Sequence, residues 1–244
     1  IRATFLLSGG VIFLAFLATT FLIKENPRST AAKSNPAGKP KSGWSQIPDK
    51  RPVVAMLTTG MLLAFATMSI EPIITVYVQQ LIEDQSRVTM VSGIVMSAAA
   101  LGAILSASHL GKLADRVGHW NVVIGALAVS ALLLIPQAFV TEGWQLIGLR
   151  FLMGLALGGL LPCITSVIRH NVPDGVGGNV LGLAISAQYA GQVLGPLSGG
   201  FVGGHFGMRA VFLGTSVLMA LGAAYNWIVQ TRRTRHMLLE AGEP

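Results

Sequence analysis

The order of apolar and polar residues divides the chain into seven long apolar segments separated by polar ones. Each apolar segment has about 20 residues or more, and an α-helix rising ~1.5 Å per residue then covers the ~30 Å hydrocarbon core of a bilayer. We therefore predict an all-α integral membrane protein with these spans: 3–23, 53–81, 88–110, 121–140, 144–168, 180–202 and 210–230.

The polar segments carry the basic residues unevenly. Segments 24–52, 110–120, 169–178 and 231–244 together hold 13 of the 17 Lys and Arg residues. Basic loops of membrane proteins tend to face the cytoplasm. We therefore expect these four segments, and with them the C-terminus, to be cytoplasmic.

The composition of the chain is that of a membrane protein and not of a soluble domain. Hydrophobic residues make up 52% of the chain and charged residues 11%, whereas about a quarter of the residues in a soluble domain are charged. The net charge of +7 does not indicate nucleic-acid binding, because the basic residues lie between spans, where they act as topology determinants. Cys163 is the single cysteine, so we expect no disulfide framework. The sequence has no metal-ligand spacing and no catalytic constellation, and we expect no metal, no cofactor and no enzymatic activity.

A short charged segment joins spans 88–110 and 121–140. Its sequence is Gly-Lys-Leu-Ala-Asp-Arg-Val-Gly, residues 111–118. We expect a tight loop in which the two glycines allow the chain to reverse where side chains would clash. Asp115 and Arg116 then lie at a joint between two helices, either as solvated loop residues or as a functional contact.

Glu71 is the only acidic residue well inside an apolar segment, and Pro72 follows it and interrupts the span. An intramembrane carboxylate is costly unless it is paired, protonated or exposed to water, so it is a candidate functional residue. Apolar surroundings favour the neutral carboxyl, which suits a group that binds and releases a proton. Binding of a cationic substrate is the other candidate role. The alternatives are a position near the outer interface and a structural pairing with an arginine such as Arg150.

Span 144–168 carries Arg150 near its start, followed by Gly154, Gly158 and Gly159. Glycines four residues apart place small residues on one helix face and allow a neighbouring helix to approach closely. Arg150 lies about two turns inside the span. Its guanidinium either extends to the outer interface or belongs to a functional site.

Span 180–202 combines glycines with a proline: Gly191, Gly195, Pro196, Gly199 and Gly200. We expect the proline to bend the helix and the glycines to let it pack closely while bent. Gln188 and Gln192 share a face because they are four residues apart, and Tyr189 lies beside them. These polar side chains either line a substrate cavity or form hydrogen bonds across helices.

The segment 111–118 resembles the cytoplasmic signature of the major facilitator superfamily. The matching residues are Gly111, Leu113, Ala114, Asp115, Arg116 and Gly118. The match ends at His119 and Trp120, where the family usually has basic residues. Other segments are similar to the drug:proton antiporter branch of the family: 69–72, 77–78, 132–136, 149–152, 195–197 and 209–213. The resemblance implies a fold of two related six-helix halves, with the substrate bound between them near the midplane.

The resemblance also implies a function and a set of roles. The function is export of amphiphilic, often cationic, compounds in exchange for protons by alternating access. Gly111, Asp115, Arg116 and Gly118 would form a conformational latch. Arg150 resembles, by analogy with another helix of the family, an arginine linked to proton coupling. The glycines and proline of span 180–202 resemble the antiporter motif of exporters, placed here in the symmetry-related helix.

The order of one span, a basic segment and six further spans fits the second part of a twelve-helix facilitator. We expect residues 1–23 to be its sixth helix and residues 24–52, with seven Lys or Arg and five prolines, to be a flexible cytoplasmic central linker. Residues 53–230 would be the C-terminal six-helix bundle, and 231–244 a cytoplasmic tail. The expected partners are a small-molecule substrate, protons, the lipid bilayer of the cell membrane and the missing N-terminal half of the same transporter.

Other interpretations fit the sequence less well. The main alternative is a facilitator for a sugar or small metabolite, which a polar cavity rich in Asn, Gln and charged residues would favour; the spans contain few of these. A seven-helix receptor disagrees with the single cysteine and the long basic segment 24–52. A membrane enzyme lacks a catalytic constellation.

Overall fold

The computed structural model describes residues 2–22, 43–173 and 176–241. The chain divides into two separate units, residues 1–40 and 41–244. The first unit contains α1 (Arg2–Leu22), whose described side chains are almost all exposed. The predicted linker 24–52 lies outside the described residues as far as residue 42.

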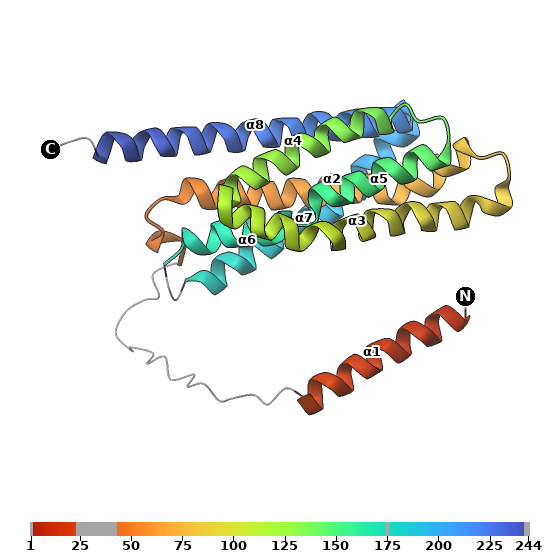
Figure 1. The fold of residues 1–244 in the computed structure, drawn as a ribbon, viewed down its shortest axis with the longest axis horizontal. Helices are drawn as coiled ribbons and strands as arrows, with labels where there is room; N and C mark the ends of the chain where they lie inside the picture. Colours follow the sequence, from red (N-terminus) through yellow and green to blue (C-terminus); the bar gives the residue numbers. More distant parts are fainter. Residues whose placement is uncertain (1, 23–42, 174–175, 242–244) are drawn as a thin grey trace. The chain divides into compact units, whose positions relative to one another are not determined.

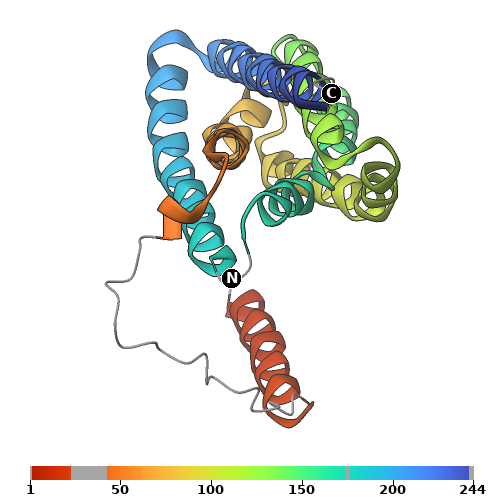
Figure 2. The same cartoon turned by 90° about the vertical axis from the view of Figure 1, so that its left-hand side faces the viewer.

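The second unit is a bundle of long helices (Figure 1; Figure 2 shows it from one end). Two short 3₁₀ helices, η1 (Gly43–Gln46) and η2 (Gln85–Arg87), precede α2 and α3. The α-helices are α2 (Lys50–Leu81), α3 (Val88–Val117), α4 (His119–Gln137), α5 (Gly143–Leu157), α6 (Leu160–His170), α7 (Gly177–Phe206) and α8 (Met208–Ala241). Within the described residues they provide six segments long and apolar enough to cross a membrane, with α5 and α6 together forming one of them. This confirms the predicted all-α membrane class.

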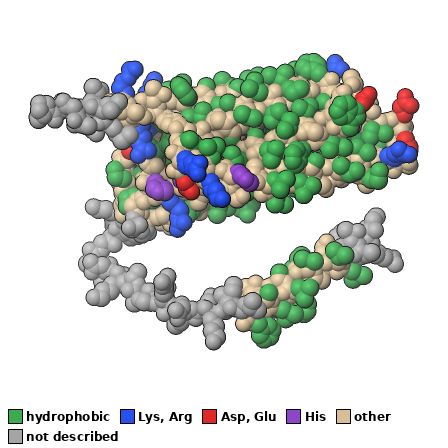
Figure 3. Space-filling view, viewed as in Figure 1, with side chains coloured by type: hydrophobic (Ala, Val, Ile, Leu, Met, Phe, Trp, Pro, Cys, Tyr) green, Lys and Arg blue, Asp and Glu red, His purple; other side chains and the backbone are tan. Residues whose placement is uncertain are grey.

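The surface of the bundle also fits a bilayer. Large apolar side chains are exposed along its flank, among them Ile104 at 71%, Leu132 at 67% and Leu197 at 71%. In Figure 3 the charged side chains of this unit gather toward its two ends, with apolar side chains between them. Apolar surface of this extent is stable only when lipid or protein covers it.

The helices pack in pairs: α2 against α7, α3 against α5, and α4 against α8. Large buried side chains such as Met56, Leu127, Leu134 and Phe212 fill the space between the pairs. We call the end that holds residues 111–118 the signature end. The opposite end holds the connections 82–87 and 138–142.

The structure corrects three details of the predicted spans. Residues 111–117 are not a loop, because α3 continues through them to Val117 and Gly118 alone separates α3 from α4. The predicted interruption at Glu71 and Pro72 is wrong, since α2 is continuous with Pro72 inside it. The predicted span 144–168 is two helices, because α5 ends before Gly158 and α6 begins after Gly159.

Candidate functional site

Glu71 on α2 and Arg150 on α5 interact electrostatically within the bundle. Arg150 is only 4% exposed, so the interpretation in which its guanidinium extends to an interface is wrong. Glu71 is half-buried, and the two opposite charges attract each other. They form no direct ion pair within the described structure. The structure thus gives Glu71 and Arg150, which the sequence analysis named as one alternative pairing, an electrostatic interaction without a direct ion pair.

A third polar residue, Gln137 at the end of α4, lies with this pair, and the sequence analysis missed it. Gln137 is fully buried. The Tyr77 hydroxyl of α2 donates a hydrogen bond to its main-chain oxygen at 2.9 Å. Its side-chain Nε2 donates to the Leu133 oxygen at 3.1 Å and lies 3.5 Å from the Met153 sulfur of α5. Gln137 therefore contacts both helices that carry the charged pair.

Several polar atoms in this region lack a partner. They are Nε and one terminal nitrogen of Arg150, together with Oε1 of Gln137. A buried donor or acceptor without a partner costs about 1–3 kcal/mol, and more when it is charged. We call Glu71, Tyr77, Gln137 and Arg150 the buried polar layer. Its unpaired groups are available to water, to a substrate or to one another in another arrangement of the helices.

The signature residues occupy the last two turns of α3 and its end. Gly118 has a φ of +93°, and its N–H donates to the Ala114 oxygen at 2.9 Å. The turn therefore needs glycine at this position. Gly111 is an ordinary helical residue with open space where a Cβ would lie, so its predicted role in reversing the chain is wrong.

Asp115 and Arg116 are exposed at the signature end. The Asp115 carboxylate lies 3.7 Å from Nε2 of His119, the first residue that departs from the family pattern. The His119 ring lies 6.1 Å, between centroids, from that of His170 at the end of α6. The two signature charges thus project away from the bundle, where a further protein surface can reach them.

Three glycines of the predicted antiporter motif form the contact between α7 and α2. A Cβ added to any of these glycines would lie too close to the backbone of α2. The distance would be 2.9 Å from Gly191 to the Phe65 nitrogen and 2.7 Å from Gly195 to the Phe65 oxygen. From Gly199 to the Ser69 carbonyl carbon it would be 2.8 Å. Gly200 faces open space. Pro196 lies inside α7, which is continuous around it. The stripe therefore serves at least as a close-packed helix contact.

The predicted cavity residues do not share one environment. Gln188 is partly buried, and its side chain packs over Gly60 of α2. Tyr189 is 61% exposed, and Gln192 is also exposed.

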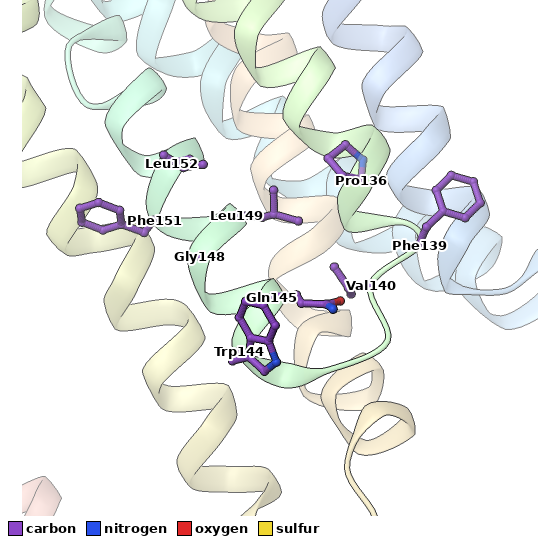
Figure 4. Close-up of a pocket in the computed structure, with 9 residues that line it drawn as sticks. All are labelled: Pro136, Phe139, Val140, Trp144, Gln145, Gly148, Leu149, Phe151 and Leu152. Atoms are coloured by element: carbon purple, nitrogen blue, oxygen red, sulfur yellow. The ribbon is translucent and has the colours of Figure 1, made fainter.

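A separate pocket of about 690 Å³ lies where α4 ends and α5 begins. Figure 4 shows it between the 138–142 connection and the first turns of α5. Its lining is mainly apolar, with Trp144 and Gln145 as its polar members; the other lining residues are Pro136, Phe139, Val140, Gly148, Leu149, Phe151 and Leu152. Its walls offer little to bind a charged group.

Comparison with known proteins agrees with this arrangement. The sequence pattern of the Major Facilitator Superfamily matches residues 1–143 and again residues 89–243. The chain is 36% identical over 240 residues to the multidrug resistance protein MdtG of Salmonella typhimurium, covering 98% of this chain and 58% of MdtG. It is 36% identical over 233 residues to MdtG of Salmonella arizonae, covering 96% and 57%. The chain therefore spans somewhat more than half the length of these relatives. On its helical architecture and these matches, the chain belongs to the Major Facilitator Superfamily.

Proposed function

We propose that this chain is part of a secondary active transporter that exports amphiphilic, often cationic, compounds in exchange for protons. The observation that carries the proposal is the buried Arg150 that interacts electrostatically with Glu71 inside a membrane-spanning bundle. Charged side chains within membrane spans are rare and commonly mark ion or substrate pathways. The similarity to proteins named for multidrug resistance supports the choice of substrate class.

In this proposal Glu71 carries the proton. When Glu71 is ionised, the charge of Arg150 attracts it. Protonation removes that attraction, and the two helices gain a different preferred arrangement. A cationic substrate competes for the same carboxylate, so that binding of the compound and binding of the proton exclude each other. The site would then exchange one bound compound for one bound proton.

The remaining predicted residues fit around this exchange. Asp115 and Arg116, exposed at the signature end, would close and open a latch against a second set of helices as access alternates. The glycine contact between α7 and α2 would let these helices move as one body. Gln188, Tyr189 and Gln192 on α7 would contribute to the wall of the substrate cavity facing that second set.

We also propose a location and a membrane topology for the chain. The second set of helices is the N-terminal half of the same transporter, since the related MdtG proteins are longer than the matched region. We propose a multi-pass protein of the cell membrane with the signature end and the C-terminus in the cytoplasm, because the basic residues Lys112, Arg116 and Arg169 lie at that end.

Efflux of a fluorescent cationic dye tests the proposal. Cells would express the whole transporter containing this chain, as wild type, as Glu71→Gln and as the control Glu83→Gln, which alters an exposed acid outside the spans. We expect wild type and the control to expel dye, a protonophore to stop both, and Glu71→Gln to lose roughly ten-fold or more of the rate, since a charged interaction is removed.

Two results would contradict this function. Dye efflux that continues unchanged in Glu71→Gln would remove Glu71 from the mechanism. A well-inserted wild type that expels no dye would favour the alternative, transport of a sugar or small metabolite.

A further inference from the structure

Gln137 is held in place by both helices that carry the charged pair. Its main-chain oxygen accepts the Tyr77 hydroxyl of α2 at 2.9 Å, and its side chain reaches Met153 of α5 at 3.5 Å. It is fully buried. A movement of α2 relative to α5 would therefore have to change at least one of these two contacts.

The hydrogen bonds of the amide define which of its ends is free. Nε2 donates to the Leu133 oxygen and lies against the Met153 sulfur, two groups that accept and do not donate. Oε1 therefore lies at the other end, and it is buried without a partner. An amide oxygen has two acceptor positions, and both are unused.

The free acceptor and the free donors belong to one buried layer. Arg150 and Met153 are three residues apart on α5, so they share a helix face and lie about one turn from each other. Both are almost fully buried. Gln137 thus contacts the residue one turn from Arg150 on this face, and Nε and one terminal nitrogen of Arg150 have no partner.

We propose that Gln137 is a positioning residue for Arg150: its Oε1 accepts the guanidinium hydrogen bond when Glu71 is protonated. When Glu71 is ionised, Arg150 turns toward the carboxylate. When Glu71 takes up a proton, Arg150 turns toward Gln137 and does not stay unpaired in the membrane. This inference rests on the proposed role of Glu71 and adds the second position of the arginine.

The other charged and titratable groups around the layer are few. Tyr77 belongs to α2, and Arg209 at the start of α8 interacts electrostatically with Tyr77. The charged residues and histidines of α3, α4 and α6 lie at the signature end; they are His109, Lys112, Asp115, Arg116, His119, Arg169 and His170. Helix α7 carries His205, next to its last residue, and Tyr189, which is 61% exposed. The exchange therefore involves Glu71, Arg150 and Gln137.

A double-mutant cycle on the purified chain in detergent tests the alternative partner without a transport assay. The variants are Gln137→Met, Glu71→Gln and the two combined. With Glu71 neutralised, Arg150 depends on Gln137, so Gln137→Met should shift the unfolding equilibrium roughly ten-fold more in the Glu71→Gln background than in wild type. Ser130→Ala is the control, because Ser130 is also buried on α4 without a partner and lies two turns from Gln137; its effect should be the same in both backgrounds.

Gln137→Glu distinguishes an acceptor from a packing residue. It keeps the length of the side chain and places a carboxylate oxygen beside Arg150. We expect it to restore the stability that Glu71→Gln removes. Additive effects in the cycle, or no restoration by Gln137→Glu, would overturn the inference.

The pH profile of efflux in the whole transporter separates this inference from the proposed function. If efflux is proton-driven, Gln137→Met should lose roughly ten-fold of its rate at low external pH, where Glu71 is protonated, and less at high pH. Proton-driven efflux with an unchanged profile in Gln137→Met would overturn the role of Gln137 and leave the function standing. A wild type without proton-driven efflux would overturn the function, and with it the role of Gln137 in coupling.

Discussion

Replacing Gly199 by alanine adds one methyl group where α7 touches α2. An alanine Cβ at this position would lie 2.8 Å from the Ser69 carbonyl carbon, whereas ordinary contact begins at 3.4 Å. The obstacle is backbone, which cannot rotate away as a side chain does. The Ser69 carbonyl oxygen is closer still, so the two helices must separate locally by more than about 0.6 Å. The neighbouring Gly200 offers a matched control, since its Cβ would meet nothing within 4 Å.

The size of the effect follows from this separation. A gap of roughly 0.5–1 Å already removes a quarter to a half of the dispersion energy of the atoms across it. Gly191 and Gly195 lie on the same contact, so their packing is weakened as well. Overpacking of this kind costs about 1–3 kcal/mol. Both alanine variants gain up to ~1 kcal/mol of helix propensity, and this gain cancels when the two are compared.

Thermal unfolding of the purified chain in detergent measures the difference. We expect Gly200→Ala to melt at or slightly above the wild-type temperature. Gly199→Ala should melt several degrees below Gly200→Ala, because 1 kcal/mol corresponds to about 2–4 °C for a chain of this size. Equal melting temperatures for the two variants would show that α7 does not lie against α2 in this register.

Two further predictions concern the connections at the ends of the bundle. Gly118→Ala should cost about 1–3 kcal/mol of stability, because Gly118 has a φ of +93°; in the same melting assay Gly111→Ala should be neutral or slightly stabilising, and equal losses for the two would refute the described turn. The hydrogen bonds that Asp84 accepts from the Ser86 hydroxyl and N–H lower the pKa of Asp84, so Ser86→Ala should raise that pKa toward its ordinary value. The ionised Asp84 carboxylate therefore stabilises the native turn at pH values above the ordinary pKa of an aspartate. This stabilisation is lost as the pH falls through the lowered pKa of Asp84. Titration of the Asp84 carboxyl by NMR checks this, and an identical titration in both proteins would contradict it.

The spans of the second unit were predictable because a bilayer requires long apolar segments, and such segments can be recognised directly in the sequence. Their ends were not. Leu113, Ala114 and Arg116 are good helix formers, so α3 continues past the apolar segment until Gly118 ends it. The break between α5 and α6 follows from the adjacent glycines 158 and 159, which the sequence analysis interpreted only as a packing face.

The candidate site was predictable in its charges but not in its partners. Glu71 and Arg150 are conspicuous because a charge inside an apolar span is costly. Their interaction was only one of several alternatives from the sequence, since 78 residues separate them and the relative positions of α2 and α5 are decided by the packing of the whole bundle. Gln137 gave still less signal, because an uncharged amide at the end of a span is compatible with an interface as well as with the interior.

The burial of Arg150 decides between two interpretations that the sequence left open. From the sequence, an arginine two turns inside a span is equally compatible with a side chain that extends to the membrane surface, which would give it no role in transport. At 4% exposure, with two of its nitrogens unpaired, Arg150 lies almost wholly inside the bundle. In the proposed mechanism its charge is balanced by the Glu71 carboxylate or by the Gln137 amide oxygen. One of these two acceptors would gain and lose a proton while the other would not, so a change of proton occupancy would select between two ways of satisfying the arginine.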